Sequence, residues 1–287
     1  MRSEEEIIRQ IVEVANSNDR IRGVLLTGSR AEPNARKDPF QDFDVTYIVT
    51  QLDAFVKDKS WIDIFGERLI LQMPEEMIIG NRDEYAFHYL MLLKDGNRID
   101  LTLFPLEKLK THFRPECFTV VLLDKDELFA KLSLPNDDHL IKRPTEKEFA
   151  DCCNEFWWVS TYVGKGLFRK EITYAKQMME LPVRTMFLKM IEWYIGAKNG
   201  FAVPFGIGGR HMTKYISAEL YNKILSTYPD SNIDNTWRSL FLMAVLFDEL
   251  ATQVASYMKL RYNKDEAVNV RQHLSWIQNF QTENKNA

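Results

Sequence analysis

The hydrophobic pattern of the chain changes near residue 130, and this change restricts the folds that the chain can adopt. Before it, short apolar runs rich in β-branched and aromatic residues alternate with turn signals, which is typical of strands. After it, apolar residues recur at helical spacing. The pattern predicts an α+β protein, with a mixed-sheet domain over residues 1–135 and an all-helical domain over residues 136–287. Prolines and a polar run within residues 132–144 indicate the connection between the two domains.

The individual elements are predicted from the same patterns and from local turn and capping signals. Strands are expected over residues 22–27, 42–49, 69–73, 85–93, 98–104 and 119–123. Helices are expected over residues 4–15, 145–163, 182–199, 211–226, 234–262 and 264–280. Asp95-Gly96 between two apolar runs predicts an antiparallel hairpin. Thr145 with Glu148 predicts a capping box, and Leu181-Pro182 predicts another helix start.

Composition excludes several classes of protein. The net charge of −4 provides no overall basic field for nucleic acid. No apolar run approaches the roughly 18 to 20 residues of a membrane span, and the acidic N-terminus does not resemble a signal peptide. Three cysteines at uneven spacing suggest neither a disulfide framework nor a zinc site, and the adjacent Cys152 and Cys153 are expected to pack as small hydrophobic side chains. We therefore expect a cytoplasmic protein without nucleic-acid or membrane partners.

Three aspartates are the most informative candidates for catalysis. Side chains alternate along a strand, so Asp42 and Asp44 point to the same face. Two carboxylates side by side repel each other, and a divalent cation removes that penalty. Asp100 stands in a third apolar strand, and its side chain joins the other two if that strand lies beside residues 42–49. Magnesium prefers such hard oxygen ligands, and two ions can support an in-line displacement.

A glycine-serine turn precedes the aspartates. Gly28 and Ser29 follow a predicted strand, where free backbone N–H groups and a hydroxyl can contact phosphate oxygens. Gly28 permits a close approach of the backbone, and Arg30 is predicted to add a charge-assisted contact to a triphosphate.

The chain also contains an internal control for this interpretation. Asp124 and Asp126 form a second Asp-x-Asp after an apolar run, but no Gly-Ser turn precedes them, and helix capping is the expected explanation. For Asp42 and Asp44, the alternative is a pair of loop-edge acids bonded to nearby cations. The combination with Gly28, Ser29 and Asp100 favours the metal site.

These residues resemble the pattern of the nucleotidyltransferase superfamily that includes DNA polymerase beta. Over nearly the whole chain the sequence is similar to the aminoglycoside 6-adenylyltransferases, through the segments TGSR, QDFD, NRIDLTLFP, VLLDKD, IKRPTEKEF, DCCNEFWWVSTYVGKGL and KMIEWYIG. The resemblance implies a polymerase-beta-like catalytic domain that transfers AMP from ATP to a hydroxyl of a streptomycin-type aminoglycoside, at the 6-position, with release of pyrophosphate. It further implies that Asp42 and Asp44 bind magnesium, two ions in all, and that Gly28 and Ser29 hold ATP phosphates. Asp100 would be the proton acceptor or a third metal ligand.

One helical face of the second half carries candidate substrate contacts. Residues at three- and four-residue steps place an acid and an aromatic ring at one end and cations at the other, namely Glu155, Trp158, Tyr162, Lys165 and Arg169. We expect ATP phosphates near Lys165 and Arg169, and a polycationic drug near Glu155 and Trp158. The alternative is that Trp158 and Tyr162 are ordinary interdomain core and that Glu155 pairs with a neighbour.

Two further features bear on the helical half. Gly164 and Gly166 are expected to weaken their helix, which leaves the position of Arg169 open. Glu192 lies in a strongly apolar helix, where an acid must be paired or face a cleft, and it is a candidate drug contact.

Three functions stay open at this point. The first is the aminoglycoside 6-adenylyltransferase. The second is a nucleotidyltransferase that modifies another aminoglycoside position or a protein partner, because a fold does not determine a substrate. The third is a catalytically silent nucleotide-binding protein of the same fold.

Overall fold

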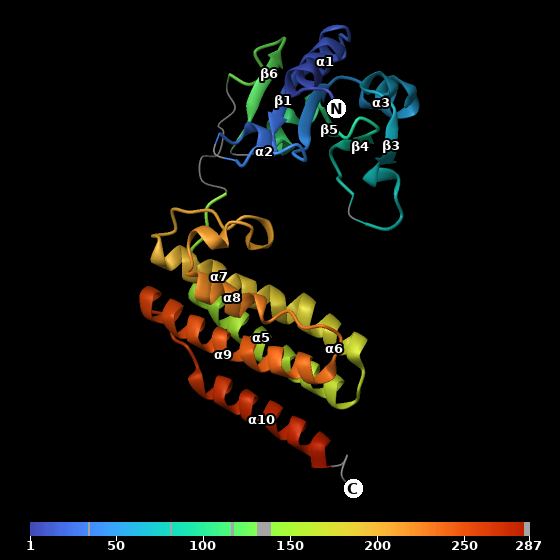
Figure 1. Cartoon of the computed structure of the whole chain (residues 1–287). Coiled ribbons are helices and arrows are strands. Elements are labelled where there is room, and N and C mark those ends of the chain that lie inside the picture. The colour runs from blue at the N-terminus through green and yellow to red at the C-terminus, as the bar shows by residue number, and fades with distance from the viewer. Residues whose placement is uncertain (34, 81, 116–117, 131–138, 284–287) are drawn as a thin grey trace. The chain divides into compact units, whose positions relative to one another are not determined.

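The structure is a computed structural model of the whole chain, and it describes residues 1–283 except 34, 81, 116–117 and 131–138. The chain divides into two compact units, Met1–Asp138 and His139–Ala287 (Figure 1). The boundary predicted after residue 135 falls outside the described residues. Each unit has a hydrophobic core of its own.

The first unit is built on a six-stranded mixed sheet with the strand order β3-β4-β5-β2-β1-β6. The strands are β1 (Ile21–Thr27), β2 (Phe43–Val49), β3 (Arg68–Gln72), β4 (Phe87–Leu93), β5 (Arg98–Pro105) and β6 (Val120–Asp124). Strands β2 and β5 are parallel and the other neighbours antiparallel, which includes the predicted hairpin of β4 and β5. All six predicted strands are present within a few residues of their expected ends.

The alternation of side chains along the strands gives the sheet one packed face. Phe43, Val45 and Tyr47 of β2 are fully or almost fully buried in the core that α1 (Glu4–Asn16) and α3 (Leu52–Lys57) share with the sheet. The Tyr47 hydroxyl donates a hydrogen bond of 2.7 Å to the carbonyl of Ile11 in α1. The residues between them, Asp44 among them, therefore point to the opposite face.

The second unit is all-helical. Its α-helices are α5 (Glu146–Phe168), α6 (Ile172–Met178), α7 (Arg184–Lys198), α8 (Ala218–Leu225), α9 (Ile233–Met258) and α10 (Lys264–Glu283). α5 begins at the predicted capping box of Thr145 and Glu148, and runs without interruption through Gly164 and Gly166. Both glycines lie in close packing contacts: a Cβ on Gly164 would lie 2.7 Å from Leu274, and one on Gly166 would lie 2.9 Å from Tyr174.

Four predicted helix boundaries in this unit are wrong. α5 ends at Phe168 rather than at residue 163. Pro182 does not begin a helix but lies inside a π-helical turn, Met179–Val183, that joins α6 to α7. The helix expected over residues 211–226 starts only at α8, where the Ser217 side chain caps the backbone N–H of Leu220. α9 ends before residue 262, because Lys259 adopts a left-handed conformation with φ of 58°.

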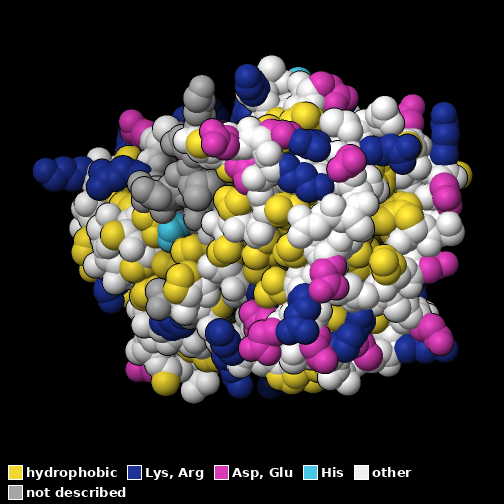
Figure 2. All heavy atoms as spheres, turned by 90° about the horizontal axis from the view of Figure 1, so that it is seen from above, with side chains coloured by type: hydrophobic (Ala, Val, Ile, Leu, Met, Phe, Trp, Pro, Cys, Tyr) yellow, Lys and Arg dark blue, Asp and Glu magenta, His cyan; other side chains and the backbone are white. Residues whose placement is uncertain are grey.

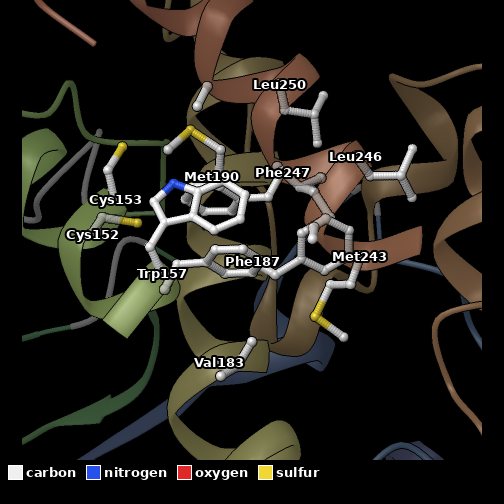
Figure 3. Close-up of a cluster of buried hydrophobic side chains, with 14 of the residues drawn as sticks. Cys152, Cys153, Trp157, Val183, Phe187, Met190, Met243, Leu246, Phe247 and Leu250 are labelled. Atoms are coloured by element: carbon white, nitrogen blue, oxygen red, sulfur yellow. The ribbon is translucent and has the colours of Figure 1, made fainter. Parts of the chain in front are cut away.

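The core of the helical unit is aromatic and sulfur-rich (Figure 3). The rings of Phe156 and Phe247 stack with centroids 3.7 Å apart, and Trp157 packs edge-on against both. Cys152 and Cys153 are buried and free, as expected for small hydrophobic side chains. Burial raises the pKa of both thiols above its usual range.

Within the described part of the chain, one helix, α9, is long and apolar enough to cross a membrane by length and composition, although no such run was expected from the sequence. Its apolar residues have another role, because 56% of the apolar stretch within this helix is buried inside the structure, where its residues pack in the core of the helical unit. On the face shown in Figure 2, acidic and basic side chains are interspersed with apolar ones and form no continuous field of either sign.

Candidate active site

Strand register brings the three predicted aspartates to one end of the sheet. Asp44 of β2 pairs in register with Asp100 of the parallel strand β5 and with Thr27 of β1. Asp42 lies two residues before Asp44, and all three acids are half-buried. The condition for their convergence, that β5 lies beside β2, is therefore met.

An arginine joins two of these acids. Arg98 donates from Nε to Asp100 Oδ1 over 2.8 Å and from Nη2 to Oδ2 over 2.7 Å, and its Nη1 lies 3.6 Å from Asp42 Oδ2. The hydrogen bond with Asp100 is the largest of the causes that raise the pKa of Arg98. The sequence prediction missed this residue, although its position two residues before Asp100, on the same face of the strand, was a signal for it.

The carboxylates show the electrostatic cost of sharing a face. Burial raises the pKa of Asp42, and the nearby charge of Asp100 raises it further, whereas Arg98 and Arg30 lower it. The net shift is upward. Asp42 therefore holds its proton more tightly than an exposed aspartate does, and an additional positive charge at this face would favour its ionised form.

The glycine-serine turn lies directly against the acids. Gly28 follows the last residue of β1 and has a φ of +68°, in the left-handed region that favours glycine. A Cβ on Gly28 would collide with Asp44 Oδ2 and lie 2.9 Å from its Cγ. The sequence needs glycine here for both reasons. Among the described residues, no hydrogen bond occupies the Ser29 hydroxyl, and Gln41 donates to the Ser29 carbonyl over 3.2 Å.

The Arg30 side chain contacts protein groups around Asp42. Its guanidinium donates to the carbonyls of Asp42 and Gln41 over 3.1 and 2.7 Å and to Glu4 over 3.0 Å, and it stacks 3.7 Å over the ring of Phe43. Its side chain is only 8% exposed. Arg30 therefore fixes the backbone that carries Asp42, and its contact with a triphosphate stays a prediction.

The donors fit a divalent cation in chemistry but not in their present arrangement. Carboxylate oxygens are the ligands that magnesium prefers. Across the described ranges, however, no group of three or more histidine, cysteine, aspartate and glutamate side chains is arranged to hold a metal ion. Arg98 supplies the positive charge that this face needs in the present conformation.

The helical unit carries a separate aromatic and charged stripe along α5. Trp158 is 60% exposed, and its Nε1 donates to the Tyr162 hydroxyl over 2.8 Å. Lys165 Nζ lies 4.7 Å from the centroid of the Tyr162 ring. Glu155 is also exposed, and Arg169 is the exposed residue that ends the helix. An exposure this large shows that Trp158 lies outside the hydrophobic core of the helical unit.

Glu192 of α7 is paired. Its carboxylate accepts a hydrogen bond of 3.0 Å from Lys189, and its side chain is 21% exposed. This pair explains how an acid is tolerated in a strongly apolar helix. A drug contact at Glu192 stays a prediction.

Comparison with known proteins adds evidence that is independent of this geometry. The family profile described as streptomycin adenylyltransferase matches residues 1–277. The chain is 44% identical to an aminoglycoside 6-adenylyltransferase of Campylobacter jejuni, over 91% of each chain, and 38% identical to one of Bacillus subtilis, over 93% of this chain and 96% of the relative. A crystal structure of an aminoglycoside 6-adenyltransferase from Bacillus subtilis is 34% identical, with 97% of this chain and 99% of that chain covered and a TM-score of 0.49.

Proposed function

The chain belongs to the streptomycin adenylyltransferase family, and we propose that it transfers AMP from ATP to a hydroxyl of an aminoglycoside. The observation that carries this proposal is the register of β2 and β5, which sets Asp44 beside Asp100 with Gly28 against the Asp44 carboxylate. ATP is a cytoplasmic co-substrate, so the proposal assigns the reaction to the cytoplasm.

In the proposed reaction, the drug hydroxyl oxygen forms a bond to the α-phosphorus of ATP. The bond from this phosphorus to the α–β bridging oxygen breaks, pyrophosphate leaves, and the hydroxyl proton passes to a carboxylate. Asp42, Asp44 and Asp100 would hold magnesium, two ions in all. When bound, magnesium would neutralise phosphate charge and stabilise the attacking and leaving oxygens.

The protein groups around the acids have separate tasks in this reaction. Gly28 and the Ser29 hydroxyl would contact the phosphates, and Arg30 holds the backbone of Asp42 in place. Asp100 has two candidate roles, as proton acceptor or as metal ligand. The Asp100→Asn variant distinguishes the two roles. If Asp100 is only the proton acceptor, the variant retains metal binding and changes the pH profile of single-turnover transfer.

The proposed acceptor is streptomycin, modified at the 6-hydroxyl. Guanidinium groups of the drug would lie on Trp158 and Tyr162 by cation–π interaction, with Glu155 and Glu192 as acidic contacts. Lys165 and Arg169 would contact ATP phosphates. The supporting observation is that Trp158 is 60% exposed and is joined to the Tyr162 hydroxyl by a hydrogen bond of 2.8 Å, so the two rings form one accessible aromatic pair.

A panel assay tests the proposal. Protein is incubated with labelled ATP, magnesium and streptomycin, kanamycin or spectinomycin, and both pyrophosphate and adenylylated drug are measured. Transfer to streptomycin that is lost in Asp44→Asn supports the proposal. Transfer only to another drug or to a protein would replace streptomycin as the proposed substrate. ATP binding without any transfer would identify a catalytically silent nucleotide-binding protein.

The aromatic stripe is tested with a matched pair of exposed tryptophans. Trp158→Ala is expected to raise the KM for streptomycin by about five- to thirtyfold, the range of a lost cation–π contact of one to two kcal/mol. Trp276 of α10 is 59% exposed and serves as the control. An equal KM change in Trp276→Ala would contradict a specific role for Trp158.

A further inference from the structure

Arg98 is the charged residue on the carboxylate face that the proposed reaction leaves without a task. Its guanidinium uses two nitrogens on the two oxygens of Asp100 and places a third 3.6 Å from Asp42. One cation thus serves two of the three acids that are expected to hold magnesium. The Arg98 side chain is 46% exposed, whereas Asp100 is 18% exposed, so the arginine can leave at less cost than the acid.

A second arginine–aspartate pair in the same sheet shows what is particular to Arg98. Arg22 of β1 also grips one carboxylate with two nitrogens, Nε to Asp126 Oδ2 over 2.6 Å and Nη2 to Oδ1. Its third nitrogen donates to a backbone carbonyl, that of Asp19. Arg22 therefore serves a single acid, whereas Arg98 bridges two acids that face the same space.

We propose that Arg98 is an internal counter-ion that competes with divalent cations for Asp100 and Asp42. In the free chain its single positive charge offsets part of the negative charge of the two acids. When a cation binds, the guanidinium releases Asp100, because two positive charges on the same carboxylate oxygens repel each other. The released guanidinium remains beside the site, where its planar donors fit the oxygens of a triphosphate.

This competition has a consequence for the order of binding. A free cation must displace Arg98 without compensation, whereas a cation that arrives on a nucleoside triphosphate brings phosphate oxygens that can take over the guanidinium. The chain should therefore bind a bare divalent cation weakly and the metal–nucleotide complex well. The inference rests on the proposed function for the role of the acids, and on the observed contacts for the role of Arg98.

The test uses full-length protein and Mn²⁺ without nucleotide. Free Mn²⁺ is measured by electron paramagnetic resonance during titration of EDTA-treated protein that is then freed of EDTA. Arg98→Ala is expected to bind Mn²⁺ about fivefold or more tightly than the wild type, since one nearby positive charge has been removed. Arg22→Ala removes a matched arginine from an acid outside the site and is expected to leave the affinity for Mn²⁺ unchanged.

A second measurement separates competition from a general loss of charge. In Arg98→Ala, equilibrium binding of the Mn²⁺–ATP complex is expected to gain at least about fivefold less than binding of Mn²⁺ alone, because the variant also loses the charge-assisted hydrogen bond from the released guanidinium to the triphosphate. If Arg98→Ala does not fold, Arg98→Lys replaces it. Lysine retains the charge but cannot grip both oxygens of Asp100, so tighter Mn²⁺ binding than in the wild type is still expected.

The outcomes distinguish this inference from the proposed function. A folded Arg98→Ala variant with unchanged or weaker Mn²⁺ binding overturns the competition, even if the wild type transfers AMP normally. Absence of AMP transfer by the wild type to any acceptor overturns the proposed function, whereas tighter Mn²⁺ binding by Arg98→Ala would still support the competition.

Discussion

The sheet contains two Asp-x-Asp pairs that differ in what surrounds them. Asp42 and Asp44 stand at the start of β2, and Asp124 and Asp126 at the end of β6. Strand β1 lies between the two strands, and it pairs its last residue, Thr27, with Asp44 and an earlier one, Gly23, with Asp124. The same Asp-x-Asp motif thus occurs at two places in this sheet, each beside an arginine.

The difference lies in the partners of the carboxylates. Asp124 accepts hydrogen bonds from the backbone N–H groups of Asp126, Leu128 and Phe129, and Arg22 grips Asp126. The expected helix after Asp124 is wrong, since residues 125–130 form turns and bends, but the carboxylate does cap the backbone. Acids satisfied by backbone N–H groups stabilise a turn. Asp42 and Asp100 instead share one guanidinium, that of Arg98, whose single positive charge offsets only part of their negative charge.

The largest expected difference between the two pairs is in catalysis. Asp44→Asn is expected to lower AMP transfer by about a hundred- to a thousandfold or more, the range for loss of one preorganised charge-stabilising group. Asp126→Asn is expected to retain wild-type turnover, because Asp126 bonds only protein groups at a turn. Steady-state rates of pyrophosphate release measure both. Comparable losses in the two variants would remove the distinction between the pairs.

Two glycines, Gly23 in β1 and Gly28 directly after it, allow the same comparison to be made at the backbone. Gly28→Ala is expected to destabilise the chain by about 1–3 kcal/mol, since alanine would be strained at a φ of +68°. Its Cβ would also displace the Asp44 carboxylate, and a shift of this kind costs about a hundredfold in rate. Urea unfolding and transfer kinetics give the two numbers.

Gly23 supplies the control on the other side of the strand. A Cβ there would lie 2.6 Å from the outer ring atoms of Phe129, near Asp124 rather than Asp44. Gly23→Ala is therefore expected to cost about 1–3 kcal/mol of stability by overpacking, with the rate of transfer preserved. A Gly28→Ala variant that kept its rate would show that the close approach of this turn to Asp44 is not needed.

The sequence was sufficient for the strands and the aspartates because both depend on local pattern. Alternation put Asp42 and Asp44 on one face, and an apolar strand around Asp100 gave its orientation. The order of the strands in the sheet was not predicted, since strand pairing depends on the whole sheet. The helical spacing of apolar residues predicted the all-helical second unit.

The arginines show where a linear pattern stops being informative. Arg30 adjoins the glycine-serine turn in sequence, yet its guanidinium lies over the Phe43 ring and bonds the backbone of residues 41 and 42. Arg98 was passed over, although it contacts two of the acids. A long side chain can reach several partners, and tertiary contacts choose among them. The exposure of Trp158 and the packing roles of Gly164 and Gly166 were likewise decided by neighbouring helices.

The smallest expected effect concerns the stability of the metal-free protein, to which Asp42 and Asp126 contribute with opposite pH dependence. The pKa of Asp42 is raised by burial, so its protonated form stabilises the native state at low pH, and this contribution is lost as pH rises through the raised pKa. The pKa of Asp126 is lowered by its hydrogen bond with Arg22, so the stability contributed by its charge is present above the ordinary pKa and is lost as pH falls through the lowered one.

In EDTA at pH 7, Asp42→Asn is therefore expected to raise the Tm by about 1–2 °C, since solvent screens a half-exposed charge, and Asp126→Asn to lower it. Near pH 3 the difference between the two variants should shrink, because the charge at Asp42 that distinguishes them is largely removed. Calorimetric Tm values at the two pH values provide the measurement. A lower Tm for Asp42→Asn at pH 7 would mean that the attraction of Arg98 for Asp42 outweighs the burial of its charge. In that case the first pair would resemble the second, and its acids would be satisfied without a cation.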